Sequence, residues 1–258
     1  MTNLLKKLFS KKSSRTFDEI KNEKKKLIGK KIHKIFSGKV VDGPYKGIKI
    51  FPKEHWSNDL GSKILGLYEK QVQENIKNLC LKKNINTIIN FGAAEGYHLI
   101  GVIKNKIVKK GFGIEIDRAT ITTLKKNISL NQLNNKIKII SDSNLNFIDK
   151  YLNKKELSKT LFLIDIEGDE YNLINTENVK LIKNSYLLIE MHPFFKVSKS
   201  KKNKLKSILK KNFKIEIIKN SGRNPFIKKI ENLSDDERWL VISEGRPNEM
   251  EWILCFPK

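Results

Sequence analysis

The chain has 258 residues, of which 39% are hydrophobic and 31% are charged. This is enough apolar material for the core of one ordinary domain, so disorder throughout the chain is excluded. No apolar run reaches the length of about 18 residues that a membrane-spanning helix needs, and the first ten residues lack the features of a secretory signal. Cys80 and Cys255 have neither metal-ligand nor disulfide spacing, so we expect a cytoplasmic protein without a cysteine nucleophile.

The net charge of +24 comes from 47 Lys and only 5 Arg against 28 acidic residues. Lys shares A/T-rich codons with Ile and Asn, which occur 35 and 26 times, so coding bias explains much of this composition. A nucleic-acid binder more often uses Arg, whose planar guanidinium matches phosphates and base edges. The charge is concentrated in residues 1–34 and 195–220, each with a net charge of +9. We interpret both as solvated basic surface; the alternative is a patch for anionic lipid, glycan or nucleic acid.

The first 82 residues divide into two units by composition. Residues 1–37 form a basic N-terminal segment that we predict to be a flexible, frayed tail. In its first 12 residues, four apolar side chains lie between lysines. The alternative interpretation of the segment is therefore peripheral contact with an anionic membrane. In residues 38–82 we predict two short strands around a Gly-Pro turn at 39–51, and one helix over 60–81 that packs on the core.

Residues 83–258 alternate between strand-like and helix-like patterns and are predicted to form the main domain. We predict helices from about residue 96, over 119–130, around 205–209, and after Ser234, which begins a capping box. Short apolar runs predict strands at 87–91, 111–116, 137–140, 161–166, 186–190, 213–218 and 252–256. This order predicts an α/β, Rossmann-like, doubly wound and mostly parallel sheet of about seven strands, with helices on both faces.

A glycine-containing turn follows the first of these strands. Gly92 permits a tight turn and close approach of a ligand to the backbone, and Gly96 allows the next helix to begin against the strand. Ala94 occupies the middle position of a dinucleotide-binding G-x-G-x-x-G pattern, and no Lys-Ser/Thr pair follows, so a P-loop is excluded. A plain structural turn is the alternative.

Two acids follow the next strands in positions that suit a nucleoside. Glu115 comes 23 residues after Gly92 at the end of the second strand, where a carboxylate can accept hydrogen bonds from both ribose hydroxyls. Asp142 follows the third strand, where an adenine ring would lie; a loop acid or helix cap is the other interpretation. The pattern therefore favours an adenosine ligand without a triphosphate.

The order of these motifs resembles class I S-adenosylmethionine-dependent methyltransferases, and in detail the FkbM-type family. The similarity spans residues of about 65–195 and rests on segments 90–97, 114–117 and 163–170, of which the last is the most specific. One departure is Asn90, where that family usually has Asp. The resemblance implies S-adenosylmethionine as cofactor, with contacts from these residues: Asn90, Gly92, Ala93, Gly96, Glu115, Ile116, Asp142 and Asp165.

The resemblance also implies methyl transfer to a hydroxyl of a sugar, glycan or other small acceptor. Such a reaction needs in-line positioning, exclusion of water and removal of the hydroxyl proton. Acids cluster after the fourth strand, and Glu190 and His192 follow the fifth. We predict His192 as general base, oriented by Asp165 or Glu190; a solvated loop histidine is the alternative. Two or three of these acids could also bind Mg²⁺, although their spacing indicates no specific metal site.

Three other functions fit parts of the sequence. An RNA methyltransferase would use the basic segments for phosphate contacts, but the fourth strand lacks the Asn/Asp-Pro-Pro-aromatic pattern common in base-modifying enzymes. A non-catalytic cofactor-binding accessory protein is compatible with Asn90. An NAD-dependent dehydrogenase fits least well because the glycine spacing is wrong. The sequence leaves the acceptor, the metal requirement and the oligomeric state open.

Overall fold

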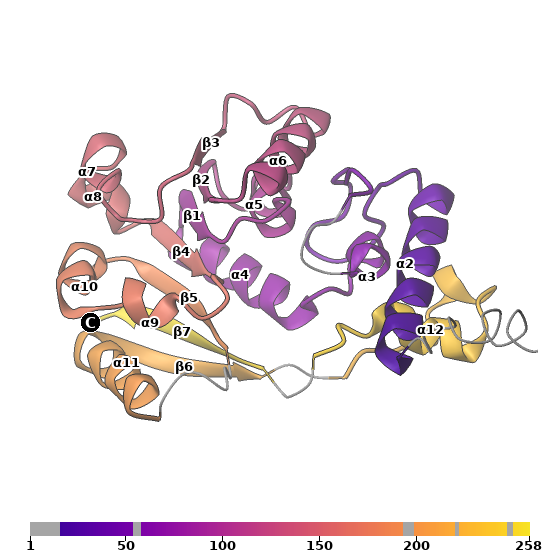
Figure 1. The fold of residues 1–258 in the computed structure, drawn as a ribbon. Coiled ribbons are helices and arrows are strands. Elements are labelled where there is room, and N and C mark those ends of the chain that lie inside the picture. The colour runs from indigo at the N-terminus through magenta and orange to yellow at the C-terminus, as the bar shows by residue number, and fades with distance from the viewer. Residues whose placement is uncertain (1–15, 54–57, 193–198, 220–221, 247–249) are drawn as a thin grey trace, which may run out of the picture.

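A computed structural model of the chain describes residues 16–53, 58–192, 199–219, 222–246 and 250–258. Within these ranges one seven-stranded sheet has the strand order β3-β2-β1-β4-β5-β7-β6 (Figure 1). Strands β1 to β5 run parallel, and β7 is antiparallel to both of its neighbours. The predicted Rossmann-like, mostly parallel fold is confirmed. The strands are β1 (Thr87–Phe91), β2 (Lys110–Ile114), β3 (Ile137–Ile140), β4 (Thr160–Ile164), β5 (Tyr186–Met191), β6 (Phe213–Lys219) and β7 (Glu251–Pro257).

Helices cover both faces of this sheet. Because successive strand residues point to opposite faces, Ile88 belongs to one hydrophobic cluster and Ile89 to the other. The first cluster includes side chains of α4 (Lys70–Lys83), α5 (Tyr97–Lys104) and α6 (Arg118–Leu130). The second includes side chains of α7 (Ile148–Tyr151), α8 (Lys154–Leu157), α9 (Glu170–Leu173), α10 (Thr176–Ile182) and α11 (Lys199–Asn212). Burial of β1 and β4 at every residue explains why their sequences are continuous apolar runs.

The N-terminal segment differs from its prediction. Residues 17–35 form helix α2 (Phe17–Ile35), which a Thr16–Glu19 capping box begins and whose Ile28 and Ile32 are buried. The helix packs against α3 (Leu60–Leu65), and a Cβ at Gly29 would lie 3.2 Å from the Gly61 nitrogen, so the two backbones are in close contact. The prediction of a frayed tail is therefore wrong for these residues, and residues 1–15 lie outside the described ranges.

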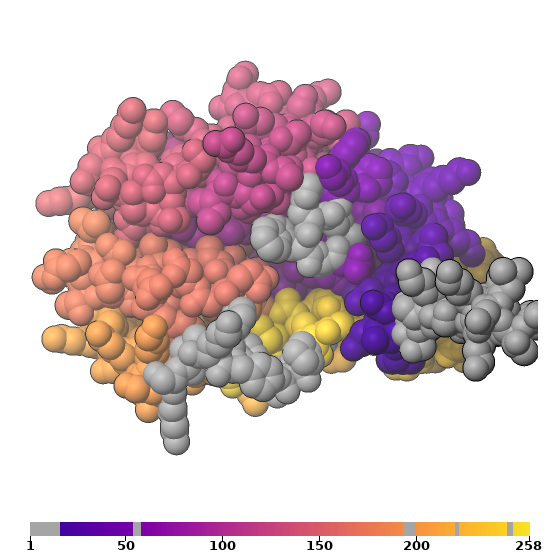
Figure 2. Space-filling view, viewed as in Figure 1, coloured from indigo at the N-terminus to yellow at the C-terminus, as the bar shows by residue number. Residues whose placement is uncertain are grey.

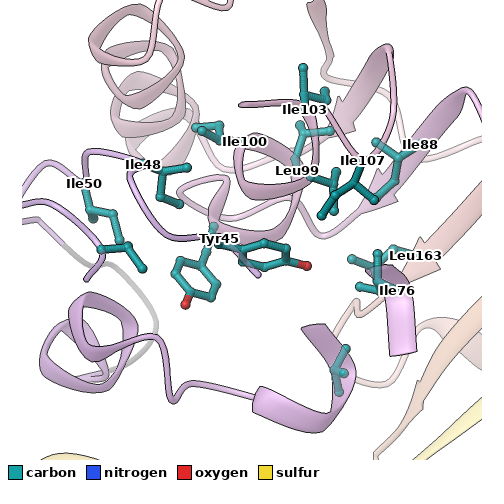
Figure 3. Packing of buried hydrophobic residues seen from close by; sticks show 14 of the residues in the cluster. Tyr45, Ile48, Ile50, Ile76, Ile88, Leu99, Ile100, Ile103, Ile107 and Leu163 are labelled. Atoms are coloured by element: carbon teal, nitrogen blue, oxygen red, sulfur yellow. The ribbon is translucent and has the colours of Figure 1, made fainter. Parts of the chain in front are cut away.

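Residues 38–53 form a compact turn structure on the first hydrophobic cluster. The two predicted strands pair through a single antiparallel bridge between Lys39 and Lys49. Tyr45 is fully buried between this segment and α5 (Figure 3), and a Cβ at Gly101 would lie 2.4 Å from its ring. The segment thus covers the helix that follows the glycine turn.

The single helix predicted over residues 60–81 is wrong. The structure has two helices, α3 and α4, separated by Gly66 with a φ of +74°. A Cβ at Gly66 would lie 2.2 Å from the Asp42 carbonyl oxygen, so this approach to residues 38–53 requires glycine. The break places Tyr68 and Glu69 in a connection instead of a continuous helix.

Other differences lie in the connections. The short helices α7 to α10 were not predicted, and β2 and β4 end two residues earlier than predicted, so Glu115 and Asp165 lie directly after their strands. The predicted capping box is confirmed: Ser234 and Glu237 begin α12 (Asp235–Ile242), after the short 3₁₀ helix η1 (Lys228–Ile230). Among the described residues, no helix has both the length and the apolar character needed to span a membrane.

Candidate active site

A cavity of about 560 Å³ opens at the carboxyl ends of β1, β2 and β4. It lies where the strand order reverses between β1 and β4, the place at which open α/β sheets bind ligands. Its volume is in the range of about 300–1,000 Å³ typical of small-molecule sites. Six of the eight predicted cofactor-binding residues line it: Asn90, Gly92, Ala93, Glu115, Ile116 and Asp165.

The glycine turn closely approaches the end of β4. Gly92 has a φ of +72°, and a Cβ there would lie 1.7 Å from the Asp165 carbonyl oxygen, so the turn requires glycine. Gly96 does not line the cavity. Its φ is +89°, and a Cβ would lie 2.5 Å from Leu124 Cδ1, so Gly96 allows α5 and α6 to pack closely.

Ala94 and Glu167 also line the cavity, and both have a positive φ. This strained backbone conformation is concentrated at functional sites.

Glu115 is held at this turn by backbone hydrogen bonds. One of its carboxylate oxygens accepts a hydrogen bond from the Ala94 nitrogen at 3.0 Å. The other accepts from the Ile116 and Asp117 nitrogens at 2.9 and 3.0 Å. The carboxylate is therefore fixed beside the glycine turn and lines the cavity, as the ribose prediction needs. Ile116 is 68% exposed at the cavity, so it presents an apolar surface there.

Two of the predicted cofactor-binding residues, Asn90 and Asp142, differ from each other in their position relative to the cavity. Asn90 is buried at the cavity and donates from Nδ2 to the Phe91 carbonyl at 3.2 Å. Asp142 does not line the cavity: it is exposed and accepts hydrogen bonds from the nitrogen and side-chain amide of Asn144. Its neighbour Ser143 lines the cavity instead. Asp142 thus has the alternative role of a loop acid.

The three predicted catalytic residues come together at the ends of β4 and β5. His192 Nε2 lies 3.5 Å from Asp165 Oδ1 and 3.4 Å from Glu190 Oε2. One possible ligand atom from each of these three side chains lies within 4.8 Å of the other two, a spacing that could hold a metal ion. Of the three, Asp165 lines the cavity, whereas Glu190 and His192 are not among its lining residues.

Two further acids, whose individual roles the sequence did not indicate, contact His192. Glu170 is completely buried, and its Oε1 lies 2.9 Å from His192 Nδ1. Glu167 Oε2 lies 3.5 Å from Nε2. Because Glu170 also accepts a hydrogen bond from the Ile166 nitrogen, it fixes the histidine ring relative to the end of β4. A buried carboxylate on one ring nitrogen orients the other toward the reactive side.

Burial and neighbouring charges shift the pKa values of these carboxylates and of the histidine. Burial and the neighbouring charge of Glu190 raise the pKa of Asp165 well above its ordinary value. Burial and the charge of Glu69 also raise the pKa of Glu190. Burial lowers the pKa of His192, but its hydrogen bond to Glu170 and the nearby carboxylates outweigh this, so its pKa is raised above 6.5. Such perturbed groups are characteristic of catalytic sites.

Arg246 connects this cluster to the N-terminal part of the domain. Its guanidinium forms ion pairs with Glu190 and Glu69, and its Nε donates to Glu244 at 2.8 Å. Glu69 is 1% exposed; burial raises its pKa, but the bond to His98 and the charge of Arg246 lower it to about 2. Arg246 therefore belongs to a network of ion pairs with three carboxylates whose side chains are at most 3% exposed.

Another part of the cavity lining comes from residues around α3 and the start of α5; of these, the sequence suggests only Tyr68 as a residue that borders the cofactor, with a core tyrosine as the alternative. It contains Tyr68, His98 and the buried Lys63–Glu95 ion pair. His98 Nε2 lies 2.8 Å from Glu69 Oε2, and its Nδ1 lies 3.1 Å from the Tyr45 hydroxyl. No pattern indicated a role for His98 or Lys63, because their partners are distant in the sequence.

No family model matches the chain, and no curated protein matches it. Solved structures with a similar arrangement include M. capricolum TrmK in complex with S-adenosyl-homocysteine, with 17% identity, a TM-score of 0.46, and coverage of 70% of this chain and 67% of that one. Precorrin-6y C5,15-methyltransferase from Geobacter metallireducens has 10% identity, a TM-score of 0.48, and coverage of 72% and 89%. An rRNA methylase from Streptococcus thermophilus has 8% identity, a TM-score of 0.47, and coverage of 72% and 95%. At such identities the likeness concerns the fold and says nothing of the substrate.

Proposed function

We propose that the chain is an S-adenosylmethionine-dependent methyltransferase that methylates a hydroxyl of a sugar, glycan or other small acceptor. The observation that carries this proposal is the Glu115 carboxylate, fixed by three backbone nitrogens beside a turn that requires glycine at position 92. A carboxylate at this position suits the two hydroxyls of a ribose. Ile116 and Ser143 line the same cavity and would flank an adenine ring.

The residues at the ends of β4 and β5 suit the remaining chemistry. When bound, S-adenosylmethionine supplies a methyl group on a positively charged sulfur, so the protein needs to position the acceptor and remove one proton. Asp165 lines the cavity, and His192 Nε2 lies 3.5 Å from Asp165 Oδ1. We propose that the acceptor's proton passes to this pair, with His192 as the base and Glu170 holding its ring in place. The Glu170 carboxylate, 2.9 Å from Nδ1, then balances the positive charge of the imidazolium.

Titration calorimetry of the full chain tests cofactor binding. We expect S-adenosylmethionine to bind and NAD not to bind. Glu115→Ala should weaken that binding by at least about 100-fold, because two charge-assisted hydrogen bonds are lost. Glu177→Ala is the control, since Glu177 is exposed on α10 and lies outside the cavity. Equal affinity of both variants would overturn the cofactor assignment.

Transfer of a labelled methyl group from S-adenosylmethionine tests the acceptor class. We expect label in sugar and glycan acceptors and not in RNA, and we expect His192→Ala to bind the cofactor normally but to lose transfer. The alternative of an RNA substrate has one observation in its favour: α11 carries seven lysines and no acid. Label in RNA that falls steeply with salt would support that alternative. Cofactor binding without any transfer would indicate a non-catalytic accessory protein.

A further inference from the structure

The outward face of α2 carries large apolar side chains that the protein leaves exposed. Phe17 is 79% exposed, Leu27 and Ile35 are each 59% exposed, and Ile20 is 53% exposed. At about 3.6 residues per turn these four positions fall within an arc of roughly 80° on the helix. The helix buries Ile28 and Ile32 against the domain on its inner side. Ile28 lies only about 20° around the helix from Phe17 and Ile35, so the exposed stripe adjoins the buried face and extends the apolar surface of the helix into solvent.

Lysines lie within this exposed apolar stripe and along its edge. Lys24 and Lys31 lie between its apolar residues, Lys34 lies along its edge, and all three are exposed. Lys24 also lies 3.7 Å from Glu237 of α12, a weak pair across the helix contact. The 15 residues that precede Thr16 continue this composition, with five large apolar residues and five basic residues. A basic, amphipathic N-terminal region of this kind suits a negatively charged, partly apolar partner.

The position of α2 brings this stripe to the outside of the molecule. Figure 2 shows the indigo N-terminal residues at its surface, and α2 packs on α3, whose Lys63 lines the cavity. The neighbouring α12 carries Trp239, which is 54% exposed and stacks edge-on against Phe226. Helices α2, α3 and α12 lie together at one end of the molecule (Figure 1), and the contacting pair Phe226 and Trp239 adds exposed aromatic side chains to those of α2.

We propose that the outward face of α2 binds the surface of an anionic phospholipid bilayer. Phe17, Ile20 and Leu27 would enter the boundary between headgroups and acyl chains, and the lysines would contact lipid phosphates. A second copy of the chain fits less well, because a two-fold contact through this face would bring its lysines together. Nucleic acid fits less well because phosphate contacts need no exposed apolar stripe. The proposal is independent of the reaction at the cavity.

Vesicle co-sedimentation of the full chain tests this proposal. We expect binding to vesicles of phosphatidylcholine with phosphatidylglycerol and little binding to phosphatidylcholine alone. Leu27→Asp should lower the partition coefficient at least about tenfold, because it removes apolar burial and adds repulsion. Lys31→Gln with Lys34→Gln should lower it by roughly 30-fold and should reduce its salt dependence. The intensity and wavelength of Trp239 fluorescence report the contact independently.

Leu130→Asp is the matched control, since Leu130 is 46% exposed on α6, away from α2. Its vesicle binding and its unfolding midpoint should equal those of the unmodified chain, and Leu27→Asp should share that midpoint. Equal loss in both variants, equal binding to neutral and anionic vesicles, or no binding at all would overturn the proposal. A dimer in light scattering that Leu27→Asp converts to monomer, without vesicle binding, would also overturn it and would assign the face to a second copy.

Discussion

Replacement of Arg246 by Ala should destabilise the protein strongly and in a pH-dependent way. Arg246 pairs with Glu69, Glu190 and Glu244, whose side chains are at most 3% exposed. The pKa of Glu69 falls from 4.5 to about 2 in the folded protein. At about 1.36 kcal/mol per pKa unit, this shift corresponds to about 3 kcal/mol of stability at neutral pH, to which the hydrogen bond with His98 contributes most and the charge of Arg246 next. Removal of one partner from a buried ion pair typically costs a similar amount, about 3–5 kcal/mol.

Urea unfolding at several pH values measures this effect. A depressed pKa in the folded state stabilises the protein above the unfolded value of 4.5, and this contribution is lost as the pH falls toward about 2. We therefore expect Arg246→Ala to lose about 3 kcal/mol at pH 7, with a smaller difference from the unmodified chain as the pH falls below 4.5. Arg238→Ala is the control, because Arg238 has a similar exposure of 21% but hydrogen-bonds carbonyl oxygens of residues 230 and 231. Equal losses in both variants, or a loss at Arg246 that does not change with pH, would refute this reasoning.

Two further substitutions address the turn and the histidine. Gly92→Ala should destabilise the protein by about 2–4 kcal/mol in urea unfolding and weaken S-adenosylmethionine binding in calorimetry, because its Cβ would overlap the Asp165 carbonyl oxygen; unchanged stability would contradict the close approach. NMR titration should give His192 a pKa above 6.5, and Glu170→Gln should lower it. Since a raised pKa stabilises the protonated folded form, this contribution to stability is complete below pH 6.5 and disappears as the pH rises through the folded value. A His192 pKa at or below 6.5 in the unmodified chain would contradict the proposed contact.

The central strands β4 and β5 were predictable because burial on both faces makes each of them a continuous apolar run, whereas the edge strand β6 alternates apolar with charged residues. The bounds of β1 and β3 agree with those predicted from the sequence. Helices α7 to α10 were not predictable in this way, because segments of four to seven residues are too short to show helical periodicity. Helix α2 was missed because its exposed apolar residues obscure the pattern expected of a surface helix, in which one face is apolar and the other polar.

The part of the cavity around the glycine turn was predictable because its signals are local. Gly92 and Glu115 each follow a strand directly, and the parallel sheet brings the ends of those strands together. The network around Arg246 was not predictable, because its partner Glu69 lies 177 positions away and no local pattern links the two. The predicted contact of Asp142 with an adenine ring has a different difficulty: the carboxylate accepts hydrogen bonds from Asn144 within its own loop and does not line the cavity.

A crystal structure of the full chain with S-adenosyl-homocysteine would test the proposed site most directly. We predict that the adenosyl group lies over the turn between Gly92 and Gly96. Both ribose hydroxyls should be within hydrogen-bond distance of the Glu115 carboxylate, and the sulfur should face Asp165. A ligand bound elsewhere, or a ribose that makes no contact with Glu115, would contradict the proposed function.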